Sequence, residues 1–426
     1  MMKLHSITYS NEGKRINYGY VVDGKHEKYF SMNNAFYAEY DVDVSSVPPS
    51  IAVIPFLSSV MPIAWFLGFD VYVDDVDKDF LESLDEIKIV LSSDWSDKHL
   101  SGELKATHIQ KNTISGSRYM MLYSGGVDAL TTYLLHREQH PDLVTILGAD
   151  IPVNDDQQWE DLLNFINAEE LLVQNRKYRV KCNFRDFYTY NVDLLVDMGW
   201  WGKVQHGLAL LGVNAPLSFV NGYKGIYIAS SQVDGFAWGS QPKIDDKVLW
   251  ADLFCRNDGS ELTRQKKVDL IVEFKKKTNS PLRVRVCYSE LNKGLNCSRC
   301  EKCYRTILAI IFAGDDPNRY GFSVHGDVYD QVYSCFEKIQ TFDLGLVNLW
   351  KDIEEKAKSN TQFFVFEDEQ KEEVSVQRIA SGALTGILLR KPRIPTHTAL
   401  MKYAVVNKYK RLYGVYRFIK KSIHLE

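Results

Sequence analysis

Apolar runs alternate with helix-period segments from residue 118 to residue 229, and this alternation is the main organising pattern of the chain. Buried strands are predicted at 118–123, 143–147, 178–183 and 225–229, and helices at 127–136, at 157–172 and from 206 onward. Strands that alternate with helices form parallel sheets with right-handed crossovers, and such sheets bind ligands at the carboxyl ends of their strands. The pattern therefore predicts an α/β fold, with a parallel sheet and helices on both of its faces.

Residues 1–117 follow a different pattern and are expected to form an N-terminal accessory domain of the α+β type. A hairpin is predicted about Asp23-Gly24, with strands at 16–23 and 28–31. A further strand is predicted at 70–75 and another at either 86–91 or 103–109, with a short helix at 78–87. The acidic cluster from Asp74 to Glu86 is better explained as a solvated helix start than as a metal site, because acidic residues favour first turns.

One uncharged stretch, from Val44 to Phe69, reaches the length of roughly 18–20 residues that a membrane-spanning helix needs. Pro55 and Pro62 interrupt this stretch, and its flanks are Asp43 and Asp70 rather than the basic residues that anchor a cytoplasmic end. A buried helical segment is therefore favoured over a membrane span.

Residues 315–426 are predicted to form a helical C-terminal region, with helices at 328–339 and 344–357. The segment 402–421 interleaves basic and aromatic side chains, a composition that could contact nucleic acid, an anionic membrane or an acidic partner. More often such a segment is a surface helix whose aromatic side chains pack on its own protein, so this interpretation is preferred.

Composition places the chain among ordinary globular proteins, since it has 426 residues, of which 45% are hydrophobic and 25% are charged. The net charge of -4 gives no overall attraction to nucleic acid. The first residues lack the basic and apolar segments of a secretory signal, and the seven cysteines then indicate a reducing compartment. A cytoplasmic location is therefore expected. Composition leaves the oligomeric state open, and a homodimer is one possibility.

The first candidate site is Ser124-Gly125-Gly126-Val127-Asp128, which stands between a predicted strand and a predicted helix. Two glycines allow backbone conformations closed to other residues, so successive N–H groups can point into one concavity at the positive end of the helix. Such a concavity binds phosphate. The loop lacks the Gly-Lys-Ser/Thr of a Walker loop. In the simpler alternative, the glycines only allow close packing between strand and helix.

The second candidate site is the cysteine cluster Cys287-x9-Cys297-x2-Cys300-x2-Cys303. Four thiolates at this spacing complete a tetrahedral zinc shell and leave no open coordination position, so a structural zinc ion is predicted. An iron–sulfur cluster is the competing interpretation, because thiolates serve both. The nearby cations Arg299, Lys302 and Arg305 would offset the thiolate charge, and they either approach phosphate or lie in solvent.

The order Ser-Gly-Gly-x-Asp resembles the pyrophosphate loop of the ATP pyrophosphatases, and the cysteine spacing is similar to that of the 7-cyano-7-deazaguanine synthases in that superfamily. The resemblance covers residues 118–314 and implies a Rossmann-like sheet of the adenine nucleotide alpha hydrolase-like type, with ATP and Mg²⁺ as cofactors besides the Zn²⁺. It implies that residues 124–127 (Ser124, Gly125, Gly126 and Val127) cradle pyrophosphate, and that Ser124 and Asp128 take part in catalysis, with Mg²⁺ at Asp128. The chain departs from the family pattern at Ala129, where a Ser or Thr is usual.

Loops at the carboxyl ends of neighbouring strands supply the remaining candidates. Asp150 follows the second strand and is assigned to the nucleotide. The loop that leaves the fourth strand, together with a histidine at the start of a helix, is assigned to the acceptor substrate; these residues are Ser230, Ser231, Trp238, Ser240, Asp245 and His206. Trp238 could instead fill the core, and a histidine placed like His206 is more often a capping or core residue.

Members of the family that the chain resembles adenylate a carboxylate with ATP, release pyrophosphate and let ammonia attack the acyl-adenylate. The chain is accordingly expected to be an ATP-dependent ligase that forms C–N bonds on a small-molecule or macromolecular acceptor, whose identity the sequence does not supply. One alternative is a thiolation enzyme, although Cys182, Cys255 and Cys335 lie in no recognisable sulfur-carrying motif. The other alternative is a scaffold that binds nucleotide without turnover, which Ala129 suggests.

Overall fold

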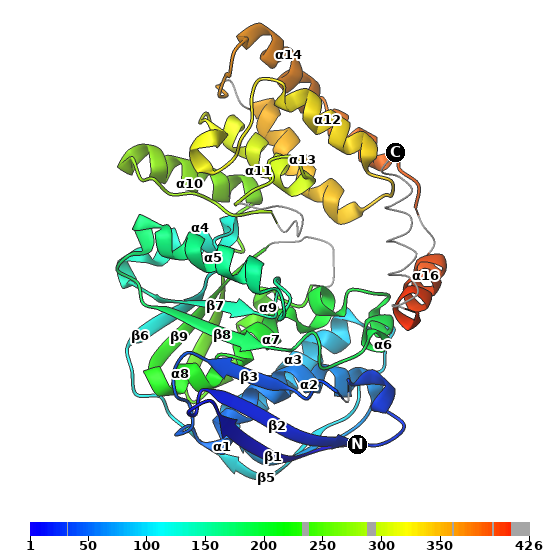
Figure 1. Ribbon diagram of the computed structural model, residues 1–426. Helices are drawn as coiled ribbons and strands as arrows, with labels where there is room; N and C mark the ends of the chain where they lie inside the picture. The colour runs from blue at the N-terminus through cyan, green and yellow to red at the C-terminus, as the bar shows by residue number, and fades with distance from the viewer. Residues whose placement is uncertain (32, 232–237, 288–294, 360–361, 394–395, 410–426) are drawn as a thin grey trace.

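A mixed sheet of eleven strands forms the centre of the protein (Figure 1), whose computed structural model describes residues 1–31, 33–231, 238–287, 295–359, 362–393 and 396–409. In spatial order the strands are β10-β11-β9-β6-β7-β8-β3-β2-β1-β4-β5. Their bounds are β1 Met2–Ser10, β2 Arg15–Val22, β3 Tyr37–Tyr40, β4 Val71–Asp77, β5 Leu104–Gln110, β6 Arg118–Leu122, β7 Asp142–Leu147, β8 Lys177–Cys182, β9 Tyr223–Ala229, β10 Leu249–Trp250 and β11 Leu253–Asp258.

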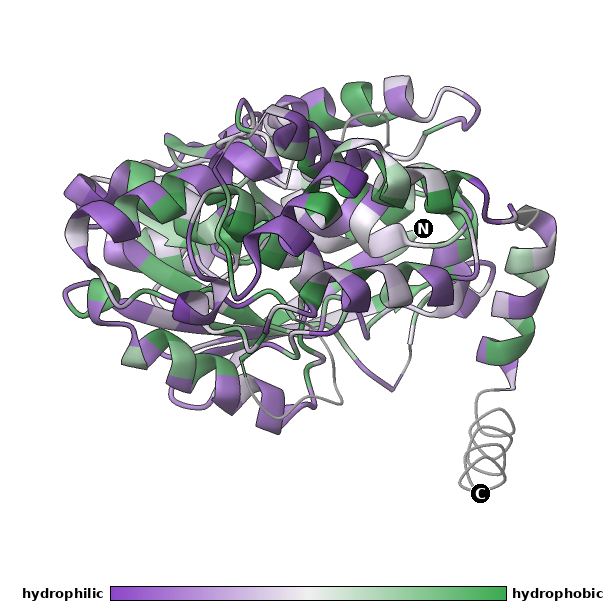
Figure 2. Cartoon of the chain, turned by 90° about the horizontal axis from the view of Figure 1, so that it is seen from above, coloured by the Kyte–Doolittle hydropathy of each residue, from purple (hydrophilic) through white to green (hydrophobic). Residues whose placement is uncertain are grey.

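Helices surround this sheet. Their bounds are α1 Pro49–Ala52, α2 Ile54–Leu67, α3 Lys78–Asp94, α4 Val127–His136, α5 Asp156–Ala168, α6 Tyr190–Asp193, α7 His206–Gly212, α8 Ala215–Asn221, α9 Pro242–Asp245, α10 Arg264–Thr278, α11 Glu301–Phe312, α12 Val328–Lys338, α13 Leu344–Ser359, α14 Glu369–Ala380, α15 Ala383–Leu389 and α16 Thr396–Lys408. Figure 2 shows that polar and apolar residues alternate along the outer helices, as expected where one helix face is buried and the other meets solvent.

The strands β11, β9, β6, β7 and β8 are parallel neighbours and form the predicted α/β part of the chain. Successive side chains of a strand point to opposite faces, so Met120 and Met121 of β6 belong to two different hydrophobic cores. The core that contains Met121 is completed by α4, α5, α10 and α11, and the core that contains Met120 by α2, α7 and α8. Helices therefore cover both faces, as the alternating pattern predicted.

The N-terminal strands extend this same sheet. β3 pairs antiparallel with β8, with Ala38 opposite Cys182, and β2 and β1 follow it in antiparallel order. β4 then pairs parallel with β1, and β5 pairs parallel with β4 at the edge of the sheet. The sheet is thus continuous across the expected boundary at residue 117, and the division of the chain into domains stays a prediction.

The predicted hairpin about Asp23-Gly24 is wrong. β1 and β2 form the hairpin instead, and the chain turns between them at Asn11, Glu12 and Gly13, which all have positive φ. Polar side chains on the outer face of β1 weakened its apolar signal. The segment expected to be the second strand of the hairpin contains the 3-10 turn Glu27–Tyr29.

The strand predicted at 86–91 is also wrong, because this segment lies within α3. Its apolar residues continue a helical spacing in which Phe80, Leu84 and Ile87 are all buried. The acidic segment does begin a helix, but Asp77, the N-cap of α3, is fully buried rather than solvated.

The uncharged stretch forms a buried helix, as predicted. Every residue of α2 from 54 to 65 is buried, Pro62 included. The helix ends at Gly68, whose φ of +69° is the left-handed conformation common at helix ends. Among the described residues, no helix has both the length and the apolar character needed to cross a membrane.

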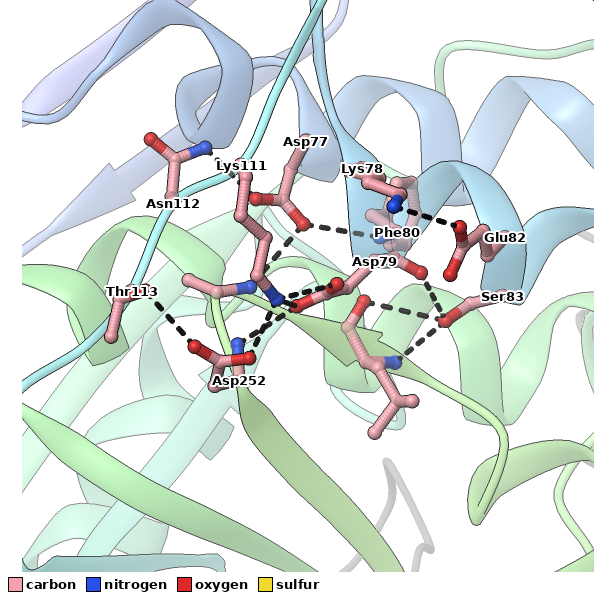
Figure 3. A network of polar contacts seen from close by, with 12 residues as sticks. Asp77, Lys78, Asp79, Phe80, Glu82, Ser83, Lys111, Asn112, Thr113 and Asp252 are labelled. Atoms are coloured by element: carbon pink, nitrogen blue, oxygen red, sulfur yellow. Dashed lines mark hydrogen bonds and ion pairs between the residues drawn. The ribbon is translucent and has the colours of Figure 1, made fainter.

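A polar network joins the two ends of the sheet (Figure 3). Lys111 lies just after β5, and its Nζ is 2.7 Å from Oδ2 of Asp79 and 2.6 Å from Oδ1 of Asp252. Asp252 belongs to the turn between β10 and β11. Asp77 accepts a hydrogen bond from the backbone N–H of Ala251 in the same turn, at 3.2 Å. The sheet is therefore curled, and its two edges meet through this network and α3.

The C-terminal region is helical, as predicted, and α12 and α13 lie close to the expected bounds. The hydroxyl of Tyr403 in α16 donates a 2.9 Å hydrogen bond to Oδ2 of Asp193. This contact supports the interpretation that the start of the basic segment packs on the protein itself. Residues 410–421 of that segment lie outside the described residues.

Candidate functional site

The Ser-Gly-Gly turn connects β6 to α4 at the carboxyl end of the parallel strands. Gly125 has a φ of +74°, and a Cβ atom there would lie 2.4 Å from a ring carbon of Phe165. Both the backbone conformation and the packing therefore require glycine at this position. At Gly126, the N-cap of α4, the nearest neighbour of an added Cβ is Oγ of Ser124 at 3.5 Å, so this side of the loop is open.

Two adjoining cavities of about 360 and 80 Å³ lie over the turn. Five residues line both of them, namely Ser124, Asp128, Ala129, Asp150 and Arg285. The larger cavity extends over the ends of β6, β7 and β9 to Ser231, His206 and Trp238. The structure therefore brings together the predicted phosphate loop, Asp150 and three of the predicted acceptor residues.

Asp128 is held by two cations from the first turn of α10. Its Oδ2 lies 2.6 Å from Nη1 of Arg264, and its Oδ1 lies 3.0 Å from Nζ of Lys267. Burial raises the pKa of the Asp128 carboxyl, but the two cations outweigh burial and hold this pKa below its ordinary value. Asp128 is therefore an ionised partner of α10.

The prediction that Asp128 holds Mg²⁺ does not fit this arrangement. Each of its two oxygens is already engaged by a cation, and a divalent ion would stand beside two positive charges. Among the described residues, one group of three or more side chains of the metal-binding types is close enough to hold an ion, and that group is the cysteine cluster.

Four cations gather around the turn, and the sequence reasoning named one of them, Lys302. It missed Arg264, Lys267 and Arg285, of which Arg264 and Arg285 line the smaller cavity with Lys302. A signal for two of them was present, because α10 follows β11 and its first turn must lie at the carboxyl edge of the sheet. Loss of hydration lowers the pKa of Lys302 to about 8, and Arg264 acts in the same direction.

Three aromatic rings line one side of the larger cavity. The ring centroid of His206 lies 5.2 Å from that of Trp201 and 5.7 Å from that of Trp238. Burial lowers the pKa of His206, while Asp150 acts in the opposite direction. The sequence reasoning missed Trp201, which lies in the π-helical turn Trp201–Gln205 before α7, a type of turn often found at functional sites.

Three of the predicted acceptor residues, Ser230, Ser240 and Asp245, are not among the residues that line these cavities. Ser240 donates a 2.6 Å hydrogen bond to Oδ2 of Asp245, and Nδ2 of Asn257 donates to the same oxygen at 2.7 Å. Burial raises the pKa of Asp245 to about 7. Ser230 is buried, and its backbone carbonyl accepts a hydrogen bond from Lys267. Residues 232–237 of the predicted acceptor loop lie outside the described residues.

The four predicted cysteines converge, and their Sγ atoms all lie within 4.8 Å of one another. The sulfur of Cys287 is 4.0 Å from that of Cys300, and the sulfur of Cys297 is 3.7 Å from that of Cys303. Tetrahedral Zn–S bonds of about 2.3 Å place two sulfurs about 3.8 Å apart. The cluster therefore fits a metal ion such as zinc.

Asn296 organises the backbone of this cage. Its Oδ1 accepts hydrogen bonds from the N–H groups of Val286 at 2.9 Å and Cys287 at 3.4 Å. Its Nδ2 donates to the carbonyl oxygens of Val284 at 2.8 Å and Gly321 at 3.0 Å. The sequence reasoning missed Asn296, since an asparagine next to a metal-binding cysteine carries no distinctive spacing of its own.

The three cations near the cage, Arg299, Lys302 and Arg305, differ in burial and in what they contact. Arg299 is exposed, and Arg305 is buried with its Nε 3.5 Å from Oε1 of Glu301. Lys302 is half-buried and lines the smaller cavity beside the phosphate loop. Of the three cations predicted to approach phosphate or solvent, Lys302 is thus the one at the candidate phosphate site.

No family model, curated protein or solved structure matches this chain. The likeness to the ATP pyrophosphatases therefore stands on the two sequence motifs. The geometry of the loop, the cavities and the cage is the basis on which a function can be argued.

Proposed function

We propose that this protein is an ATP-dependent, AMP-forming ligase that adenylates a carboxylate or an amide and releases pyrophosphate. The observation that carries the proposal is the small cavity over the Ser-Gly-Gly turn, which Arg264, Arg285 and Lys302 line together with Ser124 and Gly126. A glycine turn at the start of a helix supplies backbone N–H groups to a phosphate, and the three cations offset the charge of a polyphosphate.

In the proposed reaction an oxygen of the acceptor attacks the α-phosphorus of ATP. The bond from this phosphorus to the β-phosphate bridging oxygen breaks, and the pyrophosphate leaves with the electron pair. With a carboxylate acceptor, ammonia then attacks the adenylated carbon, the bond from this carbon to the oxygen of AMP breaks, and AMP leaves with the electron pair. The nitrogen gives up one proton to solvent, and a C–N bond remains. The side chains act through position and charge, and the cations around the turn stabilise the negative charge that develops on the leaving pyrophosphate.

The larger cavity is the proposed place for the adenosine and acceptor groups. It adjoins the smaller one at Ser124 and Asp150, so a reacting phosphate over the turn would face it directly. The aromatic side formed by Trp201, His206 and Trp238 suits a planar ring. The thiolates of the cage require a reducing compartment, so we place this activity in the cytoplasm.

The thiolation alternative loses support from the cysteines outside the cage. Cys182 and Cys255 are buried, and burial raises the pKa of both thiols well above the ordinary value. None of the three cysteines outside the cage, Cys335 included, lines the cavities over the turn. Sulfur transfer would therefore need an external donor.

The scaffold alternative is favoured by a specific observation. Both carboxylate oxygens of Asp128 are paired with Arg264 and Lys267, so neither is open to a metal ion. Ala129 supplies no hydroxyl to the cavity that it lines. A protein with such a loop could hold a nucleotide without turning it over.

The deciding experiment measures pyrophosphate release from ATP by the purified full chain, with and without a small-molecule extract, beside the variant Arg264→Gln. Release that depends on the extract and falls at least tenfold in the variant is the expected result. Binding of ATP without release in any mixture would favour the scaffold. A chain that binds no ATP would refute both functions.

A further inference from the structure

The backbone that enters the metal cage also touches the phosphate loop. The N–H of Arg285 donates a 2.9 Å hydrogen bond to the carbonyl oxygen of Gly125. The next residue, Val286, is held by Asn296, and Cys287 after it is the first sulfur of the cage. One residue, Val286, therefore separates Arg285, which contacts the glycine, from a metal ligand.

The other side of the cage reaches the same cavity through a side chain. Cys300 is the N-cap of α11, and Lys302 stands between the two sulfur ligands Cys300 and Cys303. Because both neighbouring cysteines are fixed when a metal is held, the backbone of Lys302 has little freedom. Lys302 lines the small cavity together with Ser124 and Arg264.

The charges around this cavity favour an anion with several negative charges. Arg264, Lys267, Arg285 and Lys302 supply four positive side chains, whereas Asp128 and Asp150 supply two negative ones. The two cations nearest Asp128 already compensate that carboxylate. Arg285 and Lys302, which come from the two ends of the cage, add two further positive charges, against the one negative charge of Asp150.

We propose that Lys302 binds the pyrophosphate part of the nucleotide and that the metal cage sets its position, so that metal loading controls the affinity for polyphosphate. This inference rests on the proposed function. It gives the cage a role in ligand binding in addition to its role in structure, although no coordination position of the metal is open to the ligand.

The test titrates the zinc-loaded full chain with sodium pyrophosphate and, in parallel, with ATP. Lys302→Gln should weaken pyrophosphate binding about tenfold or more, because it removes a charge-assisted contact, while the zinc content stays unchanged. Lys302→Arg keeps the positive charge and should recover most of the affinity. Lys266→Gln is the matched control, since Lys266 is an exposed lysine of α10, and it should bind as the wild type does.

Zinc removal by a chelator tests the role of the cage. Stripped wild type and stripped Lys302→Gln should bind pyrophosphate equally weakly, because Lys302 is no longer held in place. A tenfold difference that survives stripping would overturn the role of the cage. Equal binding by the loaded wild type and loaded Lys302→Gln would overturn the role of Lys302 and leave the proposed function standing, whereas a wild type that binds neither ATP nor pyrophosphate would refute that function itself.

Discussion

The Nζ atom of Lys267 lies 3.0 Å from Oδ1 of Asp128, and the same amine donates to the carbonyl oxygen of Ser230. Lys267 is only 2% exposed, so these contacts replace nearly all of its hydration. One lysine of α10 thereby connects the start of α4 with the end of β9. Lys267 therefore fixes the start of α4, which directly follows the Ser-Gly-Gly turn.

Lys267→Met should lower the free energy of unfolding by about 2–4 kcal/mol, because it leaves Asp128 with one cation and removes the hydrogen bond from Lys267 to the carbonyl of Ser230. Urea unfolding of the variant beside the wild type measures this loss. Lys266→Met, at the exposed neighbouring position, should stay within about 0.5 kcal/mol of the wild type. Equal losses in the two variants would show that the buried pair contributes nothing specific.

Gly125→Ala and Gly126→Ala should separate folding from binding. At Gly125 the added Cβ meets Phe165 and the residue must keep a φ of +74°, so the thermal midpoint should fall by several degrees. At Gly126, with a φ of -75° and an open side towards the cavity, the midpoint should change little while ATP affinity falls. Equal midpoints would contradict the packing argument, and unchanged ATP binding by Gly126→Ala would contradict the placement of the phosphate.

The cage should hold one zinc ion per chain by elemental analysis. Cys300→Ser should lose this ion, because three thiolates bind zinc more weakly than four. Cys335→Ser is the matched control, since Cys335 is a half-buried cysteine outside the cage, and it should keep the full zinc content. Iron and inorganic sulfide in the purified protein, in place of zinc, would show that the cage holds an iron–sulfur cluster.

The buried Asp245 should make stability depend on pH in a defined window. Its pKa is about 7 in the folded protein and about 4 in the unfolded chain, so between these values the unfolded chain releases a proton that the folded protein keeps. The folded protein therefore loses stability as the pH rises from about 4 to 7, by roughly 4 kcal/mol at most, and loses no more above that.

Asp245→Asn removes this titration. As the pH rises from 5 to 7.5, the free energy of unfolding of the wild type should therefore fall relative to that of Asp245→Asn. Urea unfolding at the two pH values measures the difference. Asp74→Asn, at an exposed position, should change in parallel with the wild type. If the free energy of unfolding of Asp245→Asn also changes in parallel with that of the wild type, Asp245 is ionised throughout this pH range.

Local patterns predicted the parts of the fold that local chemistry decides. β6, β7 and β9 are largely apolar runs, and the four cysteines converge because their spacing lets successive sulfurs turn to one ion. The same logic placed Ser124 and Asp150 together, since the ends of parallel strands share one edge of the sheet.

Pairings between distant polar residues could not be predicted in this way. Asp128 was expected to bind a metal. Its two carboxylate oxygens instead accept hydrogen bonds from Arg264 and Lys267, which are more than a hundred residues away in the sequence. Ser240 and Asp245 have the composition of a binding loop, yet they hydrogen-bond to each other inside the protein. A sequence shows which groups need partners, whereas only the packed chain shows which partners they find.

The curled sheet also constrains how the chain is made. Lys111 and Asp252, which close it, stand 141 residues apart, and the same core encloses α2 with residues of α7 and β10. A ribosome that adds about 5–20 residues per second needs roughly ten to thirty seconds to synthesise the segment between Lys111 and Asp252. Through that interval the uncharged helix α2 is without its partners from α7 and β10, so part of its apolar surface stays uncovered until synthesis has passed β10.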